Sequence, residues 1–222
     1  MSSFYDRSYY GNSESVADVF KLHPVKSREI EFFKRLISPQ KGEKLLDIGC
    51  GTGAYLMGLE GNGIDLWGID LSENATEIAR KRVSNPQQIL CANADPLPFG
   101  DNIFDYVTAL GIVEHFPSIP SILSEMCRVI KPQGQAVIMV PNIYYYKFIW
   151  DTLRKGAGPV RHQEIEALYS FARWKQFIEE AGLTVLRVSH HNKFNKPLLT
   201  WLRNLFIPYY FSNHFIFICT KK

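Results

Sequence analysis

A glycine-rich turn constrains this chain more than any other feature of its sequence. Residues 44–53 read KLLDIGCGTG, in which a short apolar run that predicts a strand leads directly into the turn, and a segment of helical character starts at Ala54. Because glycine carries no Cβ atom, Gly49, Gly51 and Gly53 leave backbone amides accessible, and an anionic group is favoured beside them. The sequence therefore predicts a ligand site where the strand ends.

An acidic residue follows the second predicted strand. Asp70 lies 21 residues after Gly49 (70 minus 49), at a position where a carboxylate can accept hydrogen bonds from both ribose hydroxyls of a nucleoside. Together with the glycine turn, this acid predicts a nucleoside site. In the plainer alternative, the glycines only turn the chain and Asp70 caps a helix.

The charge around the turn separates two classes of nucleoside cofactor. Gly49, Gly51 and Ala54 satisfy the pattern G-x-G-x-x-G/A, so a nicotinamide dinucleotide must be considered. Asp47 argues against it, because an acid so close to the first glycine repels a pyrophosphate. The same acid can bond through water to the ammonium group of an amino-acid-like tail. The charge pattern therefore favours a zwitterionic ligand.

Short apolar runs alternate with helical segments from about residue 43 to residue 182, which is typical of βαβ units around a parallel sheet. The predicted strands are residues 44–48, a run that ends at 67–70, and residues 88–91, 104–110, 135–140, 183–188 and 214–220. The predicted helices are residues 26–37, segments that begin at 54 and 72, and residues 121–130 and 170–181. An α/β fold follows from this order.

Four stretches of the sequence resemble a known enzyme family. LLDIGCGTG (residues 45–53) resembles motif I of the class I S-adenosylmethionine-dependent methyltransferases, and GIDLS (residues 68–72) resembles their second motif. Residues 92–116 resemble the third and fourth motifs of the small-molecule type 11 branch, and residues 123–142 resemble the helix and strand that follow. The resemblance implies a Rossmann-like, doubly wound sheet of seven strands in the order 3-2-1-4-5-7-6, with strand seven antiparallel and helices on both faces.

The resemblance also implies the cofactor, S-adenosyl-L-methionine, its product S-adenosyl-L-homocysteine, and the residues that hold them. It assigns Gly49, Gly51 and Gly53, with Cys50 between them, to the methionine end of the cofactor, where the charge pattern already places Asp47. It assigns Asp70 to the ribose, Leu71 to the adenine face, and Asn93 and the Ala94 backbone to the adenine amino group, with Asp95 as a nearby carboxylate. Ala109 and Leu110 approach the methionine end through backbone. The family usually has aspartate where this chain has Asn93. An asparagine carbonyl can still accept a hydrogen bond from the adenine amino group.

Glu114 and His115 follow the fourth predicted strand, at the edge of the sheet where open α/β folds bind ligands. Methyl transfer needs a general base only if the nucleophile starts protonated, and His115 can remove a hydroxyl proton near neutral pH. The alternative is a histidine bonded to backbone at the start of a helix. Similar quinone-type enzymes carry a third acid where this chain has Gly111, so we expect no bound metal.

Aromatic residues gather in segments that in this fold contact the acceptor. The candidate acceptor-binding residues are Tyr5, Tyr9, Asn142, Tyr145 and His162. Ordinary packing is the alternative for each tyrosine. Residues 197–211 form a further apolar stretch, for which core or dimer packing is favoured over contact with a membrane surface.

Composition narrows the classes that remain. A length of 222 residues with 46% hydrophobic content fits one methyltransferase domain, residues 1–222, in which 1–40 form a helical cap, 43–188 the cofactor core, and 189–222 an insertion and last strand. A net charge of +3 is too small for a nucleic-acid groove. Neither a secretory signal nor a membrane-spanning run is present, so we expect a cytoplasmic monomer or homodimer with at most peripheral membrane contact.

These observations predict a methyltransferase that moves a methyl group from S-adenosylmethionine to a small or lipid-like acceptor, at oxygen in preference to nitrogen or carbon. Two alternatives stay open. A regulatory subunit would retain the nucleoside site without catalysis, and a nicotinamide-dependent oxidoreductase would use the same glycine turn for a different cofactor.

Overall fold

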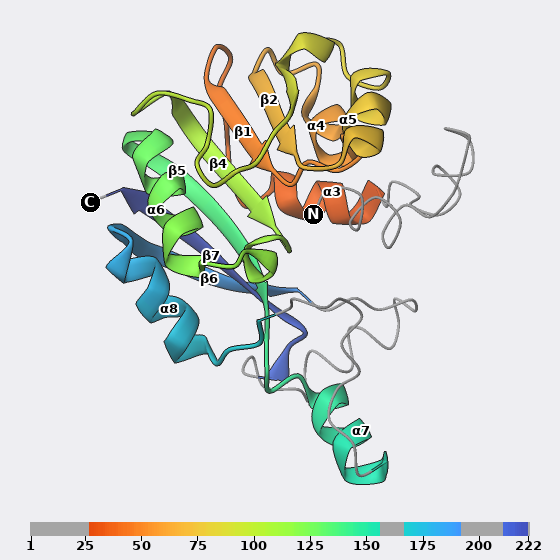
Figure 1. The fold of residues 1–222 in the computed structure, drawn as a ribbon, viewed down its shortest axis with the longest axis vertical. Coiled ribbons are helices and arrows are strands. Elements are labelled where there is room, and N and C mark those ends of the chain that lie inside the picture. Colours follow the sequence, from red (N-terminus) through yellow and green to blue (C-terminus); the bar gives the residue numbers. More distant parts are fainter. Residues whose placement is uncertain (1–26, 156–166, 192–210, 222) are drawn as a thin grey trace.

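The structure is a computed structural model that describes residues 27–155, 167–191 and 211–221, and Figure 1 shows its fold. A sheet of seven strands lies at the centre, in the order β3-β2-β1-β4-β5-β7-β6. The strands are β1 (Lys44–Ile48), β2 (Asp65–Asp70), β3 (Ile89–Cys91), β4 (Phe104–Leu110), β5 (Ile130–Pro141), β6 (Leu183–His191) and β7 (His214–Lys221). Strands β1 to β5 pair in parallel, while β7 runs antiparallel between β5 and β6. The predicted order and the predicted direction of the last strand are confirmed.

Helices cover both faces of this sheet because successive residues of a strand point to opposite sides. Leu46 packs in the apolar cluster that includes α6 (Ile119–Val129) and α8 (Phe171–Glu180). The neighbouring Leu45 packs in the cluster on the other face, with α3 (Ser27–Lys34) and α4 (Ala54–Leu59). The strands are therefore apolar on both faces, as parallel sheets in α/β proteins are.

Serine side chains fix where several helices begin. Ser72 accepts a hydrogen bond from the Ala75 N–H at 3.0 Å and caps α5 (Glu73–Arg80), as the sequence predicts. Ser118 caps α6 in the same way, so that helix begins at Ile119 rather than at residue 121. Pro120 lies in the first turn, where its lack of a backbone N–H costs no helical hydrogen bond. Short 3-10 turns, Pro86–Gln88 and Val113–His115, complete the connections before β3 and after β4.

Strand β5 is longer than the sequence predicts. It begins at Ile130, which pairs with Phe104 of β4, and the register between the two strands then shifts before the regular pairing of Tyr106 with Gln135. Residues 131–134, which predict only a stop between helix and strand, therefore belong to an irregular start of β5. Such an irregularity is not visible in a propensity pattern because it depends on the neighbouring strand.

One helix has no counterpart in the sequence-based expectation. Helix α7 (Tyr146–Lys155) follows β5 and projects from the body of the molecule (Figure 1). Most of the predicted insertion, residues 197–210, and the predicted cap before residue 27 lie outside the described residues. Within the described ranges, no helix combines the length and apolar character that crossing a membrane requires.

Candidate functional site

The turn after β1 has the backbone geometry that only glycine adopts easily. Gly49, Gly51 and Gly53 have φ angles of 71°, 51° and 74°, in the left-handed region. A Cβ atom added to Gly49 would lie 2.8 Å from Cγ1 of Ile112, which is closer than carbon atoms approach. The turn is therefore a tight, half-buried cradle of backbone at Gly49 and Gly51, with Ile112 packed against Gly49.

The acid at the end of β2 is bonded to this turn. One carboxylate oxygen of Asp70 accepts from the Gly51 N–H at 2.8 Å, and the other accepts from the Ser72 N–H at 2.9 Å. These two bonds fix the Asp70 carboxylate at the end of β2, beside the glycine turn. Leu71, the residue between Asp70 and Ser72, is 37% exposed, so an apolar side chain lies at the sheet edge beside the carboxylate.

Asp47 lies buried inside the same cluster. The Thr108 hydroxyl on β4 donates to its carboxylate at 2.6 Å, from the residue that pairs with Asp47 across the two strands. Burial raises the pKa of Asp47 to about 7; the Thr108 hydrogen bond lowers the pKa, and the charge of Asp70 raises it. Burial also raises the pKa of the neighbouring Cys50 thiol, as do both acids. A cation beside Asp47 would lower its pKa, because it favours the ionised carboxylate.

The loop after β3 is closed by two hydrogen bonds between neighbours. The Asn93 side-chain amide donates to the Asp95 carbonyl at 2.8 Å, and the Asp95 N–H donates to the Asn93 side-chain carbonyl at 3.2 Å. The Asp95 carboxylate accepts from the Ser121 hydroxyl at 2.8 Å. Ala94 is buried between them, whereas Asn93 is exposed. The exposed carbonyl of Asn93 keeps one lone pair for a donor from outside.

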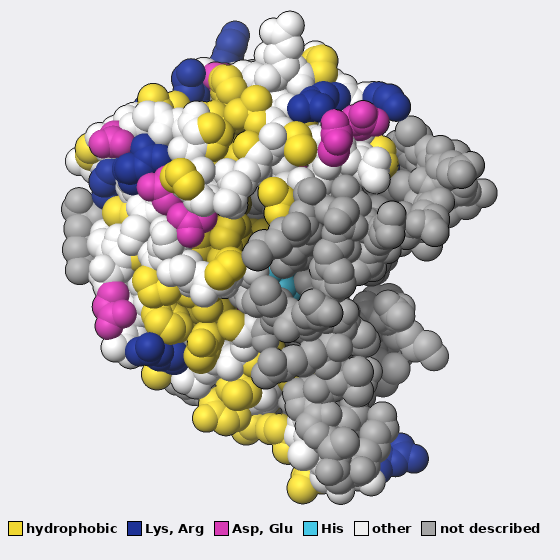
Figure 2. Space-filling model, viewed as in Figure 1, with side chains coloured by type: hydrophobic (Ala, Val, Ile, Leu, Met, Phe, Trp, Pro, Cys, Tyr) yellow, Lys and Arg dark blue, Asp and Glu magenta, His cyan; other side chains and the backbone are white. Residues whose placement is uncertain are grey.

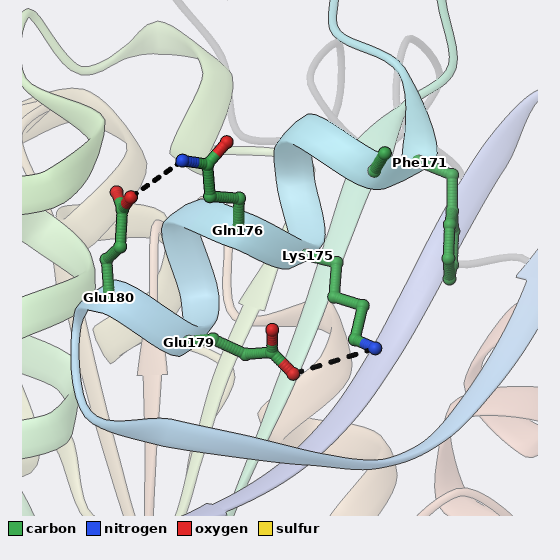
Figure 3. A pocket seen from close by; sticks show the side chains of 6 residues that line it. Phe171, Lys175, Gln176, Glu179 and Glu180 are labelled. Atoms are coloured by element: carbon green, nitrogen blue, oxygen red, sulfur yellow. Dashed lines mark hydrogen bonds and ion pairs between the residues drawn. The ribbon is translucent and has the colours of Figure 1, made fainter.

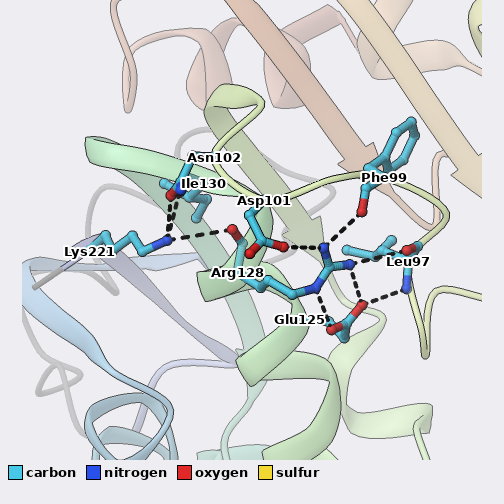
Figure 4. Close-up of polar contacts among 8 residues, drawn as sticks. All are labelled: Leu97, Phe99, Asp101, Asn102, Glu125, Arg128, Ile130 and Lys221. Carbon is cyan, nitrogen blue, oxygen red and sulfur yellow. Dashed lines mark hydrogen bonds and ion pairs between the residues drawn. The ribbon is translucent and has the colours of Figure 1, made fainter.

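Arg128 on α6 holds the continuation of that loop, as Figure 4 shows. Its guanidinium donates to the carbonyls of Leu97 and Phe99, at 3.2 and 2.8 Å, and to the Asp101 carboxylate at 2.8 Å. Glu125 accepts from two of its nitrogens and also from the Leu97 N–H at 2.7 Å. Hydrogen bonds from Arg128 lower the pKa of Glu125. The loop is therefore fixed to α6 by charge-assisted hydrogen bonds.

The end of β4 brings a third segment to the same edge. Ala109 is fully buried and Leu110 is half-buried at the last positions of the strand. The Gly111 N–H donates to the Met139 carbonyl of β5 at 3.0 Å, and a Cβ atom on Gly111 would come within 3.3 Å of the Met139 methyl group. The chain turns there with a left-handed φ of 76°, which directs the following residues across the sheet edge.

Glu114 and His115 lie in the short turn that follows. The Glu114 carboxylate is buried, and its Oε1 is 4.0 Å from Nε2 of His115, whose side chain is largely buried as well. A carboxylate at this distance stabilises a protonated imidazole. In the part of the chain that the structure describes, no group of three or more His, Cys, Asp or Glu side chains is arranged to hold a metal ion.

The acceptor residues predicted after β5 are buried. Asn142 is fully buried, its side-chain amide donates to the Ser212 carbonyl at 2.9 Å, and its side-chain carbonyl accepts from the Tyr144 N–H at 2.9 Å. Tyr145 packs edge to face on Phe148, with ring centroids 5.1 Å apart. The bond to Ser212 links the end of β5 to the segment just before β7, and the other contacts hold the chain after β5. The other predicted acceptor residues, which lie outside the described residues, are Tyr5, Tyr9 and His162.

The structure adds residues that the sequence analysis does not single out, namely Ile112, Thr108, Ser121 and Arg128. Thr108 had a visible signal, since it is the only serine or threonine in the run of residues 104–110. Arg128 had a weaker one, a carboxylate three positions earlier on the same helix face. Ile112 had none, because its contact with the glycine turn depends on the path of the loop after β4.

Two surface hollows lie away from these residues. One, of about 450 Å³, lies on α8, where Lys175 pairs with Glu179 at 3.7 Å and Gln176 bonds to Glu180 at 2.8 Å (Figure 3). The other, of about 290 Å³, lies beside the turn before β2 and is lined in part by Glu60. Neither hollow is lined by a residue of the predicted site. The candidate site is the cluster of turns at the carboxyl ends of β1, β2, β3 and β4, because the contacts described above bring the predicted residues together there.

Comparisons with known proteins agree on one family. Residues 46–138 match the family model described as a methyltransferase domain. Demethylmenaquinone methyltransferase of Listeria monocytogenes serotype 4a (strain HCC23) is 32% identical over 200 residues, which cover 78% of this chain and 82% of that protein. A relative from Shouchella clausii (strain KSM-K16) with the same name is 30% identical and covers 77% of this chain and 76% of that protein.

A solved structure supports the same fold. An S-adenosylmethionine-dependent methyltransferase from Thermotoga maritima superposes with a TM-score of 0.72 at 18% identity, and the match covers 100% of this chain and 99% of that chain. At 18% identity this superposition is evidence for the fold alone. The evidence for the family comes from the family model and the sequence relatives.

Proposed function

The chain belongs to the type 11 branch of the class I S-adenosylmethionine-dependent methyltransferases, and from that premise we propose that it methylates a small, lipid-like acceptor of the quinone class. The family supplies the reaction and the cofactor. The acceptor class is inferred from the sequence relatives, which are demethylmenaquinone methyltransferases; the Listeria protein is 32% identical over 82% of its length. A quinone with an apolar tail also fits the aromatic acceptor segments that the sequence predicts.

The residues at the sheet edge fit S-adenosylmethionine, which when bound supplies a methyl group on a positively charged sulfur. The turn at Gly49 has no room for a Cβ atom and presents backbone. Asp70 places a carboxylate acceptor at the end of β2, where ribose hydroxyls can donate to it, and the exposed Leu71 beside it suits the face of an adenine ring. Asp47, whose pKa is raised to about 7, suits a ligand that brings an ammonium group.

We propose that His115 is the general base and that Glu114 orients it. Proton transfer from an aromatic hydroxyl to the imidazole makes the ring oxygen nucleophilic and leaves a protonated His115, which the Glu114 carboxylate at 4.0 Å stabilises. The role of the protein is then to hold that oxygen in line and to exclude water. Loss of this proton, which leaves the ring oxygen as an anion, is the only change that the acceptor needs before the displacement.

The acceptor atom is the finer part of this proposal. We propose the oxygen, as the sequence predicts, because it carries most of the charge after deprotonation. The same deprotonated ring also carries charge at the carbon next to that oxygen, and a reduced quinone offers both atoms. Because the sequence relatives act on a quinone by name, this ring carbon is the second candidate for the methylated atom. Both reactions need His115 in the same role.

The proposed acceptor site lies over the ends of β4 and β5. Since Asn142 and Tyr145 are buried, we propose that they shape this site from below by fixing the chain after β5. Tyr5, Tyr9 and His162 stay predictions as acceptor contacts, as does the assignment of residues 1–222 to one domain.

A product analysis tests the proposal. The protein is incubated with methyl-labelled S-adenosylmethionine and, separately, with a reduced quinone of short apolar tail, a catechol, a primary amine and a fatty acid. We expect label in the reduced quinone, and the proton chemical shift of the new methyl group distinguishes oxygen from carbon. Transfer to the amine or the fatty acid alone, or methylation of the quinone at neither atom, would contradict the acceptor class.

A further inference from the structure

Helix α7 presents its apolar side chains to solvent. Trp150 is 64% exposed and Leu153 is 77% exposed, the two highest values among large hydrophobic side chains in the described part of the chain, and Ile149 is exposed as well. Ile143 and Tyr144, just before the helix, are exposed too. Surface helices of globular proteins normally show the reverse pattern, with the apolar stripe turned towards the core.

The helical period puts these residues on one face. At 3.6 residues per turn, Ile149, Trp150 and Leu153 fall within an arc of about 100°. Phe148 falls outside that arc and packs instead on Tyr145, with 5.1 Å between the ring centroids. Helix α7 is thus anchored through Phe148, and its apolar arc faces away from this anchor.

The helix is also basic. Its sequence, YKFIWDTLRK, carries three basic residues and one acidic residue, a net charge of +2 (3 minus 1), against +3 for the whole chain. Arg154 is exposed and follows Leu153 directly at the rim of the apolar arc. Figure 2 shows hydrophobic and basic side chains at the end of the molecule where Figure 1 has α7. An apolar arc with a tryptophan and a basic rim is the pattern of helices that lie on anionic lipid surfaces.

The size of the arc disfavours a second protein as its partner. Three such side chains offer on the order of 400 Å² of apolar surface, whereas a stable dimer buries about 1,200 Å² or more. A lipid surface sets no such minimum, because it surrounds each inserted side chain with apolar matter and adds attraction between basic groups and lipid phosphates. The excess of positive charge also repels a second copy of the same helix.

We propose that α7 docks this enzyme on an anionic lipid surface, with Trp150 and Leu153 inserted at the boundary between headgroups and acyl chains and Arg154 on the lipid phosphates. The biological purpose of this docking rests on the proposed lipid-like acceptor, whereas the evidence for the docking is the exposure and charge of α7 itself. Because only residues 142–145 separate α7 from the end of β5, docking there would bring the carboxyl edge of the sheet close to an acceptor dissolved in the lipid.

Vesicle sedimentation with the full chain tests the docking. Vesicles of phosphatidylcholine are compared with vesicles that also contain phosphatidylglycerol. The double variant Trp150→Glu/Leu153→Glu is compared with Leu186→Glu, a leucine on β6 that is 56% exposed and serves as a matched control. We expect binding to the anionic vesicles roughly tenfold tighter than to the neutral ones. The double variant should lose at least roughly 30-fold of that affinity, and the control should keep it.

Other outcomes overturn the docking. Equal loss in the Leu186→Glu control would show a general charge effect, and unchanged binding of the double variant would place the contact elsewhere. A dimer of the wild-type chain, seen by sedimentation velocity without lipid and abolished in the double variant, would assign the arc to a second copy.

Failure of the docking and failure of the proposed acceptor are separable by one further measurement. Methylation of a short-tailed, water-soluble reduced quinone does not need α7, so the double variant should turn it over at the wild-type rate. Normal turnover of this acceptor without vesicle binding by the wild-type chain contradicts the docking alone. Vesicle binding that depends on Trp150 and Leu153, without methylation of any quinone, supports the docking and contradicts the acceptor class alone.

Discussion

The two halves of the sheet edge are built differently. Over β1, β2 and β3, hydrogen bonds from backbone and polar side chains fix the turns, as the carboxylate of Asp70 does with the N–H groups of Gly51 and Ser72. Beyond β5 the chain instead exposes large apolar side chains, with Trp150 and Leu153 on α7 foremost. A cofactor shared by a whole family calls for backbone geometry that leaves little freedom. Docking on a lipid surface, as proposed for α7, instead calls for apolar side chains that stand outside that geometry and can change without disturbing it.

The largest effect should come from removing a glycine from the fixed half. Gly49→Ala places a methyl group 2.8 Å from Ile112 and strains a left-handed backbone, so we expect a loss of about 3 kcal/mol in stability and loss of S-adenosylhomocysteine binding. Gly61→Ala is the matched control, because its φ is 86° but nothing lies within 4 Å. It should cost only about 1 kcal/mol. Equal losses in urea unfolding would refute the role assigned to Ile112.

The next effect falls at the boundary between the halves. If His115 is the base, His115→Ala should lower turnover roughly 100-fold and leave the affinity for S-adenosylhomocysteine unchanged. His190→Ala, at the end of β6, serves as the control and should keep full turnover. Turnover that survives in His115→Ala would leave this histidine with a structural role.

A smaller effect is expected for the acid of the fixed half. Asp70→Ala should weaken binding of S-adenosylhomocysteine by about 2 kcal/mol, because the proposed ribose hydrogen bonds to a charged group are lost. Titration calorimetry measures this directly. The control variant is Asp101→Ala, which removes an exposed carboxylate that accepts from Arg128 and has no predicted contact with the cofactor. This variant should bind the nucleoside normally. Unchanged affinity in Asp70→Ala would remove the ribose from this position.

The smallest effect is a dependence on pH. Asp47 has an ordinary pKa of 3.8 and a pKa of about 7 in the folded chain, so the fold binds its proton more tightly. Its contribution to stability is therefore present at low pH and lost as the pH rises from about 4 to about 7.

Cofactor binding should show the opposite slope, since an ammonium group near Asp47 favours the ionised carboxylate. We expect the affinity for S-adenosylhomocysteine to rise roughly tenfold between about pH 6 and about pH 8. Calorimetry in buffers of different ionisation enthalpy should detect a released proton. Asp47→Asn should abolish both signals, and a slope that persists in this variant would exclude Asp47 as the titrating group.

The fixed half was largely predictable from the sequence because its signals are local. The spacing of Gly49, Gly51 and Gly53 and the acid at Asp70 identify turns whose backbone needs those residue types. The strand order and the antiparallel direction of β7 came from the resemblance to the family rather than from the pattern of apolar residues, and they too are confirmed.

Contacts between distant segments were not predictable in the same way. The bond from Thr108 to Asp47 depends on the register of β4 against β1, and the packing of Ile112 on Gly49 depends on the path of a loop. Asn142 looked like an acceptor residue, but the structure buries it in hydrogen bonds that join β5 to the start of β7. For α7, the sequence shows the aromatic residues and the structure shows which of them face outwards.

The most direct test of this account is methyl transfer to a reduced quinone by the wild-type chain and by His115→Ala, measured with labelled S-adenosylmethionine beside calorimetric binding of S-adenosylhomocysteine. The account predicts labelled quinone from the wild-type chain, roughly 100-fold slower labelling by the variant, and equal nucleoside affinity in both. No labelling of any quinone by a wild-type chain that binds the nucleoside would contradict the acceptor class. Equal labelling by both proteins would contradict the chemistry proposed at the end of β4.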